Sequence, residues 1–294
     1  MSGGQGITQE LGLGEVVSKT FELYRRDFSK YAVLFVVVEA IIGVLTTLVR
    51  RAVILPAALP STATTQQLVN WLPGFFGALI TLIALSAIVT WGFYPISVGS
   101  AVKLASEEIV TGQAGLVPSV RFAISRIVWI WAVGIVVGIV VILGLVALVV
   151  PGIILAIMYS LVLPVVMLER AGFESLGRSR KLVSRRWLKT FALVIVLGII
   201  VGIASGVVSA ISGPFGVAST IVSNILSAFY LPIIPIALTV YYYSNAARIA
   251  PPMSETLMAP GDRLQVGMKF CPNCGTQIAS STMFCTACGA KQPI

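Results

Sequence analysis

The sequence that decides the fold is IVWIWAVGIVVGIVVILGLVALVVPGIILAIMYSLVLPVVML, residues Ile127 to Leu168. None of these 42 residues is Asp, Glu, Lys or Arg. A helix needs about 20 apolar residues to cross a hydrocarbon core of about 30 Å, so the stretch is long enough for two crossings. Pro151 and Gly152 lie near its middle and favour a turn there. Because Arg126 and Arg170 flank its ends, the sequence predicts a helical hairpin with both ends on one side of a membrane.

The composition of the whole chain is typical of a membrane protein. Of its 294 residues, 57% are hydrophobic and 11% are charged, whereas a soluble domain carries about 25% charged residues. The net charge is +9, but most basic residues flank apolar stretches, which favours an anionic membrane surface over nucleic acid as their partner. The chain has no His, which excludes His-based acid–base catalysis and Ser-His-Asp triads. We therefore expect no enzymatic activity.

Further apolar stretches on both sides of the hairpin raise the number of predicted transmembrane spans to six. In residues 11–30, apolar residues recur at helical spacing and charged residues take the opposite face, which predicts an amphipathic helix at the membrane interface. After a loose tail of residues 1–10, we predict an all-α polytopic membrane protein whose six transmembrane helices form three helical hairpins with interfacial amphipathic helices. The membrane domain covers residues 11–247, and the predicted spans are residues 31–49, 75–102, 127–149, 152–168, 190–211 and 217–243.

Weak internal repetition supports a division of the membrane domain into three repeated units, each an amphipathic segment followed by a hairpin of two spans. Each predicted even-numbered span contains a Pro between an aromatic or aliphatic residue and a β-branched one. The segments before the first and third spans also share a spacing of Gly, Ser, Phe and Arg, for which chance similarity is the alternative. The matching residues are Gly14, Ser18, Phe21 and Arg25 in one segment and Gly115, Ser119, Phe122 and Arg126 in the other.

The distribution of basic residues predicts the orientation. With six spans, 18 of the 20 Lys and Arg residues fall on the side of the two termini, and Arg50 and Arg51 fall on the other. Basic residues concentrate on the cytoplasmic side of membrane proteins. We therefore expect a multi-pass protein of the cell membrane with both termini in the cytoplasm.

All four cysteines lie in the last 26 residues, in two C-x2-C pairs separated by ten residues: Cys271, Cys274, Cys285 and Cys288. Two such pairs supply the four thiolates of a tetrahedral structural site, so we predict one structural Zn²⁺ ion, with Fe as the alternative metal. Four protein ligands leave no open position for catalysis. The pattern predicts a zinc-ribbon domain over residues 269–294, joined by a linker of residues 248–268 that contains several Pro residues.

Glu39 is the one carboxylate within the predicted spans. It lies nine residues after Lys30, so a helical rise of 1.5 Å per residue places it roughly 13 Å deep, near the bilayer centre. Ionisable residues at that depth often mark a functional site. The alternative is a structural, protonated Glu that is hydrogen-bonded to Tyr159, Ser160 or Asn224.

Two other features have a functional and a structural interpretation. The basic segment before the fifth predicted span could bind anionic lipid headgroups, or its charges could serve only to orient the chain. Gly134 and Gly138 form a G-x3-G pair, which favours close packing between helices. The candidate headgroup contacts are Arg178, Arg180, Lys181, Arg185 and Arg186.

Short motifs before the first predicted span and around the end of the fourth carry a family resemblance. They are Leu13-Gly14-Glu15 through Tyr24-Arg25-Arg26, Leu163-Pro164-Val165-Val166-Met167-Leu168-Glu169, Ser175-Leu176-Gly177-Arg178-Ser179 and Arg186-Trp187. They resemble the integral membrane domain fused to some bacterial glycerophosphodiester phosphodiesterases, and its uncharacterised stand-alone relatives. The catalytic barrel of that family is absent, so the resemblance does not imply phosphodiesterase activity. Residues 270–292 resemble the zinc ribbons appended to many prokaryotic, especially archaeal, proteins, which commonly serve as interaction modules.

Two functions follow as expectations. The first is a non-enzymatic membrane protein that anchors a cytoplasmic zinc ribbon for contacts with a protein partner. The second is a transporter or lipid-handling protein, with an unknown substrate, that uses Glu39 and the Pro-broken even-numbered spans. Nucleic acid is not an expected partner, because Lys269 and Lys291 are the only basic residues of the ribbon. Convergence of Glu39, Asn224 and Tyr159 on one cavity would favour the second function.

Overall fold

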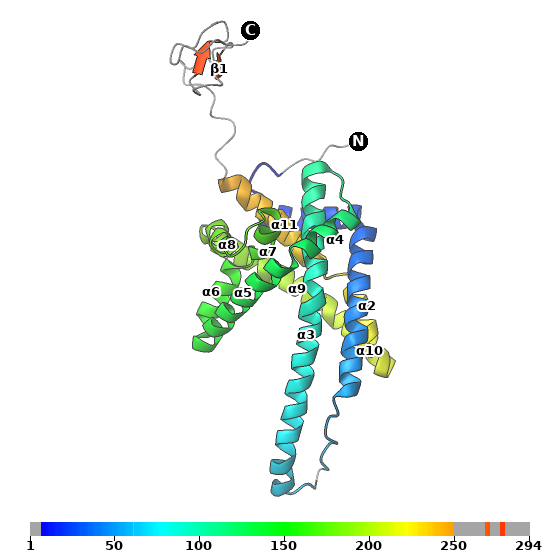
Figure 1. Ribbon diagram of the computed structural model, residues 1–294. Coiled ribbons are helices and arrows are strands. Elements are labelled where there is room, and N and C mark those ends of the chain that lie inside the picture. The colour runs from blue at the N-terminus through cyan, green and yellow to red at the C-terminus, as the bar shows by residue number, and fades with distance from the viewer. Residues whose placement is uncertain (1–6, 61, 250–267, 271–276, 280–294) are drawn as a thin grey trace. The chain divides into compact units, whose positions relative to one another are not determined.

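The computed structural model describes residues 7–60, 62–249, 268–270 and 277–279, and the chain divides into two compact units (Figure 1). In the first unit, Met1–Ile249, the described residues form helices and the segments that connect them. The second, Ala250–Ile294, contains the antiparallel strands β1 (Met268–Phe270) and β2 (Gln277–Ala279). The helices of the first unit are α1 (Leu13–Arg26), α2 (Phe28–Ala52), α3 (Thr65–Thr111), α4 (Leu116–Ser125), α5 (Ile127–Ala147), α6 (Val149–Met158), α7 (Val162–Leu168), α8 (Glu174–Ser184), α9 (Trp187–Ser212), η1 (Gly213–Ala218), α10 (Ser219–Ser227) and α11 (Ile233–Ile249).

Several helices are long and apolar enough to cross a membrane. Five such segments occur among the described residues: Phe28–Ala52, Thr65–Thr111, Ile127–Ala147, Val149–Leu168 and Trp187–Gly216. Their apolar side chains are largely uncovered by protein, and no residue is buried in the most apolar part of α3. Soluble monomers rarely expose contiguous apolar surface of this kind. The helical unit is therefore compatible with a multi-pass membrane protein.

Helix α3 is longer than the span predicted over residues 75–102. Its 47 residues extend about 70 Å at 1.5 Å per residue, and it runs beside α2 (Figure 1). The helix begins at Thr65, ten residues before the predicted start of the second span. The Thr64 hydroxyl oxygen accepts a hydrogen bond from the Gln67 backbone N–H, and the Gln67 side-chain oxygen accepts one from the Thr64 N–H. This capping box starts the helix and was visible in the sequence as Thr-x-x-Gln.

Pro95, one of two prolines in α3, leaves a backbone carbonyl oxygen without its helical donor, and another helix supplies a donor. Pro95 has no backbone N–H, so the carbonyl oxygen of Trp91, four residues earlier, loses its helical donor. The indole Nε1 of Trp131, on α5, donates to this oxygen at 3.1 Å. The helix therefore continues through Pro95, as the sequence predicted for a membrane helix.

The predicted sixth span, residues 217–243, is not a continuous helix. The chain forms α10, then a run of turns over residues 228–232, and then α11. Pro232 and Pro235 lie at the start of α11, where a missing N–H is tolerated, and so favour a new helix at that point. The fourth predicted span is interrupted in the same way, because turns over residues 159–161 separate α6 from α7.

Helix α11 forms the centre of the helical unit. Its buried residues occur around its whole circumference, and it contacts α1, α3, α7 and α8. Four consecutive polar residues of α11 bind four different parts of the chain: Tyr241 with Thr190 at 2.8 Å, Tyr242 with Glu169 at 2.8 Å, Tyr243 with Ser106 at 2.8 Å, and Ser244 with the Leu11 N–H at 2.9 Å. The apolar face of α1 packs against this core, so protein rather than lipid covers it.

Helices α1, α4 and α8 share one relation to the long apolar helices that follow them. Each ends at a short break, and α2, α5 and α9 then begin after Asp27, Arg126 and Arg186. Seven residues before each break lies a buried hydroxyl residue, and seven residues after it a buried aliphatic one. In this structural alignment Asp27 is equivalent to Arg126. The alignment made from the sequence had Arg25 equivalent to Arg126, so the two alignments differ by two residues. The equivalent buried residues are Thr20, Ser119 and Ser179, and Leu34, Val133 and Leu193.

Gly152 permits the tight α5–α6 turn, which lies at Leu148 rather than at Pro151 and Gly152 as predicted. A Cβ atom at Gly152 would lie 2.6 Å from the backbone N of Leu145. We expect Gly152→Ala to destabilise the protein by about 1–3 kcal/mol through overpacking. Gly138→Ala is the control, since a Cβ there has no neighbour within 4 Å. Thermal unfolding in detergent measures the stability of both variants. Equal unfolding midpoints would contradict the close approach of the chain at Gly152.

Candidate functional site

Ion pairs and hydrogen bonds gather the basic residues of several helices at one end of the helical unit. Arg26 pairs with the buried carboxylate of Glu108 on α3 and also donates to the Glu108 carbonyl oxygen at 3.2 Å. Lys30 donates to the Ala114 carbonyl oxygen at 2.8 Å. Arg248 donates to the Leu182 carbonyl oxygen at 3.1 Å. These contacts join α1, α3, α8 and α11, whose basic residues lie far apart in the sequence.

Glu10 anchors the start of the chain to the same end. Its carboxylate lies 2.7 Å from Lys189 Nζ and 2.8 Å from an Arg186 Nη atom. The hydrogen bond from Lys189, followed by that from Arg186, holds the pKa of Glu10 below its ordinary value, although partial burial opposes the shift. Residue 10, predicted to belong to a loose tail, therefore belongs to the structured end.

The lowered pKa of Glu10 predicts a pH-dependent contribution to stability. A carboxylate with a lower pKa in the folded state stabilises that state above its unfolded pKa, and the effect is lost as the pH falls through the folded pKa. We expect Glu10→Gln to cost about 0.2–1 kcal/mol near pH 7, because the pairs are partly exposed. The cost should shrink as the pH falls from 7 through the lowered pKa of Glu10 in the folded state. Unfolding midpoints across this range measure it, and a cost that persists in acid would contradict the prediction.

The five candidate lipid-headgroup residues differ in their surroundings. Arg178 is paired with Glu169 at 2.9 Å, and Arg186 is paired with Glu10. Arg180, Lys181 and Arg185 are exposed and form no ion pair with the residues that the structure describes. These three lie on the outer side of α8, whose other side buries Leu182 and Val183 among other residues. The exposed three therefore remain the candidates for external anions.

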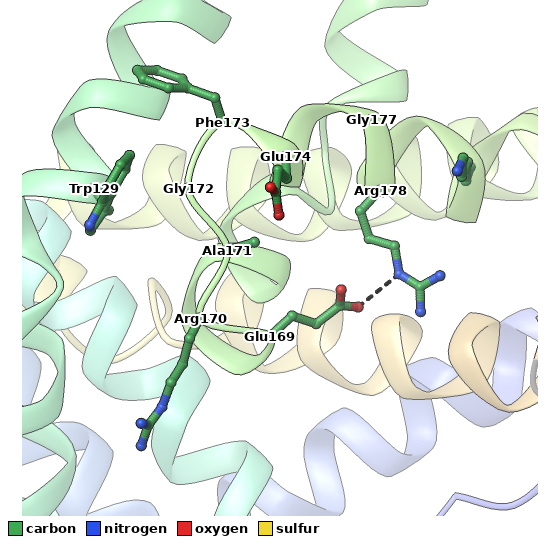
Figure 2. Close-up of a pocket in the computed structure, with 10 residues that line it drawn as sticks. Trp129, Glu169, Arg170, Ala171, Gly172, Phe173, Glu174, Gly177 and Arg178 are labelled. Carbon is green, nitrogen blue, oxygen red and sulfur yellow. Dashed lines mark hydrogen bonds and ion pairs between the residues drawn. The ribbon is translucent and has the colours of Figure 1, made fainter.

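A cavity of about 660 Å³ lies where the chain enters α8 (Figure 2). It is lined by Trp129, by residues 169–174, and by Gly177, Arg178 and Lys181. A Cβ atom at Gly172 would lie 2.6 Å from the Trp129 ring, so glycine allows the loop to pack against the indole. The Glu169–Arg178 ion pair spans the cavity, which contains both acidic and basic groups. Its mixed charge does not define one type of ligand.

Glu39 is buried on α2, but the three residues considered as its hydrogen-bond partners lie in different places. The Asn224 amide lies against the α2 backbone at Glu39 and Gly43 rather than against the Glu39 carboxylate. Tyr159 and Ser160 line a cavity between α3, α5 and the α6–α7 break, whereas Asn224 lines another one with Arg50. Glu39 lines neither of these two cavities.

The sequence analysis missed the aromatic neighbours of Glu39. Tyr94 lies near both Glu39 and Tyr230. The Tyr230 hydroxyl in turn binds Ser205 at 2.8 Å and Ser227 at 3.0 Å. The signal was the aromatic residue beside Pro95 and the one two positions before Pro232. The surroundings of Glu39 are thus a group of hydroxyl-bearing side chains.

The four predicted zinc ligands, Cys271, Cys274, Cys285 and Cys288, lie outside the residues that the structure describes. The strands next to the first pair are described: Phe270 pairs with Gln277, and Met268 pairs with Ala279. In the sequence, the first C-x2-C pair falls between these two strands.

Comparison with known proteins identifies this part of the chain. A family model described as the zinc-ribbon domain matches residues 270–292. No curated protein and no solved structure matches the chain. The zinc-ribbon match supports binding of zinc at the C-terminal end. It does not extend to residues 11–247, so nothing in the comparisons supports the resemblance of that region to a glycerophosphodiester phosphodiesterase membrane domain.

Proposed function

We propose that this protein is a non-enzymatic, multi-pass membrane protein that anchors a cytoplasmic zinc ribbon for contacts with a protein partner. The observation that carries the proposal is the pairing of two unlike units in one chain. A helical unit with extensive uncovered apolar surface precedes a separate unit that contains a zinc-ribbon domain. A ribbon bound to one structural metal offers a folded surface but no open coordination position for a reaction.

The membrane arrangement that we propose has three units, each an amphipathic helix followed by a hairpin of two crossings. The common position of the breaks at Asp27, Arg126 and Arg186 supports this division. In the third unit, α10 and α11 together take the place of a single sixth span. The basic end of the unit would face the cytoplasm, in accordance with the positive-inside rule, and both termini would lie there.

The metal that we propose is one Zn²⁺ ion held by Cys271, Cys274, Cys285 and Cys288. Support comes from the zinc-ribbon match and from the C-x2-C spacing, which suits a tetrahedral site of four thiolates. Fe could occupy the same ligands, so metal analysis of the purified protein must measure both elements.

The outer side of α8 should bind anionic lipid headgroups. Replacing Arg180, Lys181 and Arg185 together with Gln should weaken the retention of anionic lipid by about 1 kcal/mol per residue, because each cation near the surface attracts anionic lipid by that amount. The measurement is the amount of anionic lipid that copurifies with the protein in detergent. Arg50→Gln with Arg51→Gln is the control at the opposite end. Unchanged lipid retention in the triple variant would show that these charges serve only to orient the chain.

Transport or lipid handling through Glu39 is the second candidate. The group of hydroxyls near Glu39 favours it, since polar side chains at that depth are costly unless they have a use. The separation of Glu39 from the cavities that contain Tyr159 and Asn224 counts against a continuous polar pathway. We therefore favour the anchor function over transport or lipid handling.

The experiment that tests the anchor function compares the full chain with a chain lacking residues 269–294. Both are purified from membranes with bound proteins preserved by mild cross-linking, and the bound proteins are identified by mass spectrometry. We expect the specific partners of the full chain to be lost on truncation. An unchanged set of partners would contradict the proposal, because the helical unit alone would then account for the contacts.

A further inference from the structure

A cavity of about 310 Å³ lies between α3, α5 and the α6–α7 break, on helices whose apolar surface is largely uncovered by protein. Most of its lining is aliphatic or aromatic, and from α5 it takes Ile130, Val133, Gly134 and Val137. These four residues follow one side of the helix over about 10 Å, at 1.5 Å per residue. The cavity is therefore a groove that runs along α5, and we call it the α5 groove.

Gly134 gives the α5 groove part of its width. A Cβ atom at Gly134 would have no neighbouring atom within 4 Å, so this glycine does not allow another helix to approach. The close packing predicted for the G-x3-G pair is therefore wrong at Gly134, and equally at Gly138. Glycine inside a helix costs about 0.5–1 kcal/mol relative to alanine. The space that it leaves belongs to the groove.

The charged end of the helical unit meets one end of the α5 groove. Arg126 lies directly before α5, and its Nη2 donates to the carbonyl oxygens of Val166, at 3.4 Å, and Ala171, at 3.2 Å. The Val166 side chain lines the groove. The Nε of Arg126 is buried and has no hydrogen-bond partner among the residues that the structure describes. The Arg126 guanidinium thus keeps one unpaired donor beside residues that line the apolar groove.

Two further cations lie over the ring of Phe122, four residues before Arg126. Lys103 and Arg170 sit over the ring of Phe122, with 5.1 and 5.5 Å to its centroid. Phe122 packs against the apolar cluster that includes Ile130 and Val166, which also line the α5 groove. Lys103 is paired with Glu107 at 3.3 Å, so the end of the groove keeps a net positive charge.

We propose that the α5 groove binds one anionic phospholipid, with an acyl chain along α5 and the phosphate at the end formed by Arg126, Lys103 and Arg170. An apolar groove open to hydrocarbon, ending at a cluster of cations, is complementary to a molecule that is apolar over most of its length and anionic at one end. The site is separate from the outer side of α8, and it does not depend on the zinc ribbon.

The test uses the full chain reconstituted into vesicles of phosphatidylcholine that contain a minor fraction of phosphatidylglycerol. The phosphatidylglycerol carries a photoactivatable group in its acyl chain, and cross-linked peptides are mapped by mass spectrometry. We expect the label to concentrate on the peptides that contain residues 91–98 and 159–166. Gly134→Leu, which fills the groove without a clash at Cβ, should reduce this label about tenfold, which corresponds to 1.4 kcal/mol of binding.

Gly202→Leu is the matched control, because Gly202 lies on the apolar helix α9 and a Cβ there also has no neighbour within 4 Å. It should leave the label unchanged. Gly134→Val is the milder filling variant, for use if the leucine variant does not fold. Equal labelling of the wild type and the filled groove would overturn the proposal. So would equal labelling by photoactivatable phosphatidylcholine, which would show general bilayer contact without selection of the anionic lipid.

Discussion

Replacing Cys271 and Cys274 with Ser should abolish zinc binding and unfold the C-terminal unit while the helical unit stays intact. The proposed site needs all four thiolates, and a small ribbon has too little apolar core to fold without its metal. In zinc-finger peptides, metal binding contributes about 10–16 kcal/mol of apparent free energy, so the expected loss is complete. Metal analysis should give about one zinc per wild-type chain and none in the variant.

Thr286→Ser is the control for this experiment. Thr286 lies inside the second C-x2-C pair but carries no thiolate, so zinc content should be unchanged. Limited proteolysis then separates the two units: the variant should lose its protected C-terminal fragment and keep its protected helical fragment. Retention of one zinc per chain in the double Ser variant would show that these cysteines are not its ligands.

Ile236→Ala should destabilise the helical unit by about 2–5 kcal/mol. Ile236 is 0% exposed in the first turn of α11, so truncation removes buried apolar contact and leaves a cavity. The measurement is the free energy of unfolding in detergent, followed by circular dichroism as denaturant increases.

Ile83→Ala is the matched control, with the same chemical change on α3. The Ile83 side chain is 59% exposed to what we propose is lipid, so truncation there should change the stability by less than about 0.5 kcal/mol. A larger effect at Ile83 than at Ile236 would mean that α11 faces the membrane, as the sequence alone predicted, and that α3 lies in the core.

The sequence analysis predicted an all-helical unit with several long apolar helices, and the structure has them, because apolar composition and length decide such helices. It could not distinguish a helix surrounded by lipid from one surrounded by other helices, since both require apolar side chains. Residues 217–243 illustrate this limit: the sequence predicted one span, and the structure has two helices with α11 in the core. The polar run Tyr241–Asn245 was the available signal, because four of its residues bind four other parts of the chain.

The candidate sites were predictable to different degrees. The zinc ribbon follows from local spacing, because the two C-x2-C pairs carry their own geometry. The neighbours of Glu39 did not follow, because Tyr94, Ser205 and Tyr230 come from distant segments. The α5 groove was also hidden, since only the structure shows that a Cβ at Gly134 would meet open space.

The most direct test of the central claim introduces a specific protease site into the predicted linker, residues 248–268, and digests sealed membrane vesicles of both orientations. The account predicts that vesicles with the cytoplasmic face outward release a soluble fragment carrying the zinc, while the helical unit stays in the membrane. Vesicles with the opposite orientation should release none. Zinc that stays with the membrane after complete cleavage, or that is released only from vesicles with the outer face exposed, would contradict a cytoplasmic ribbon anchored by the helices.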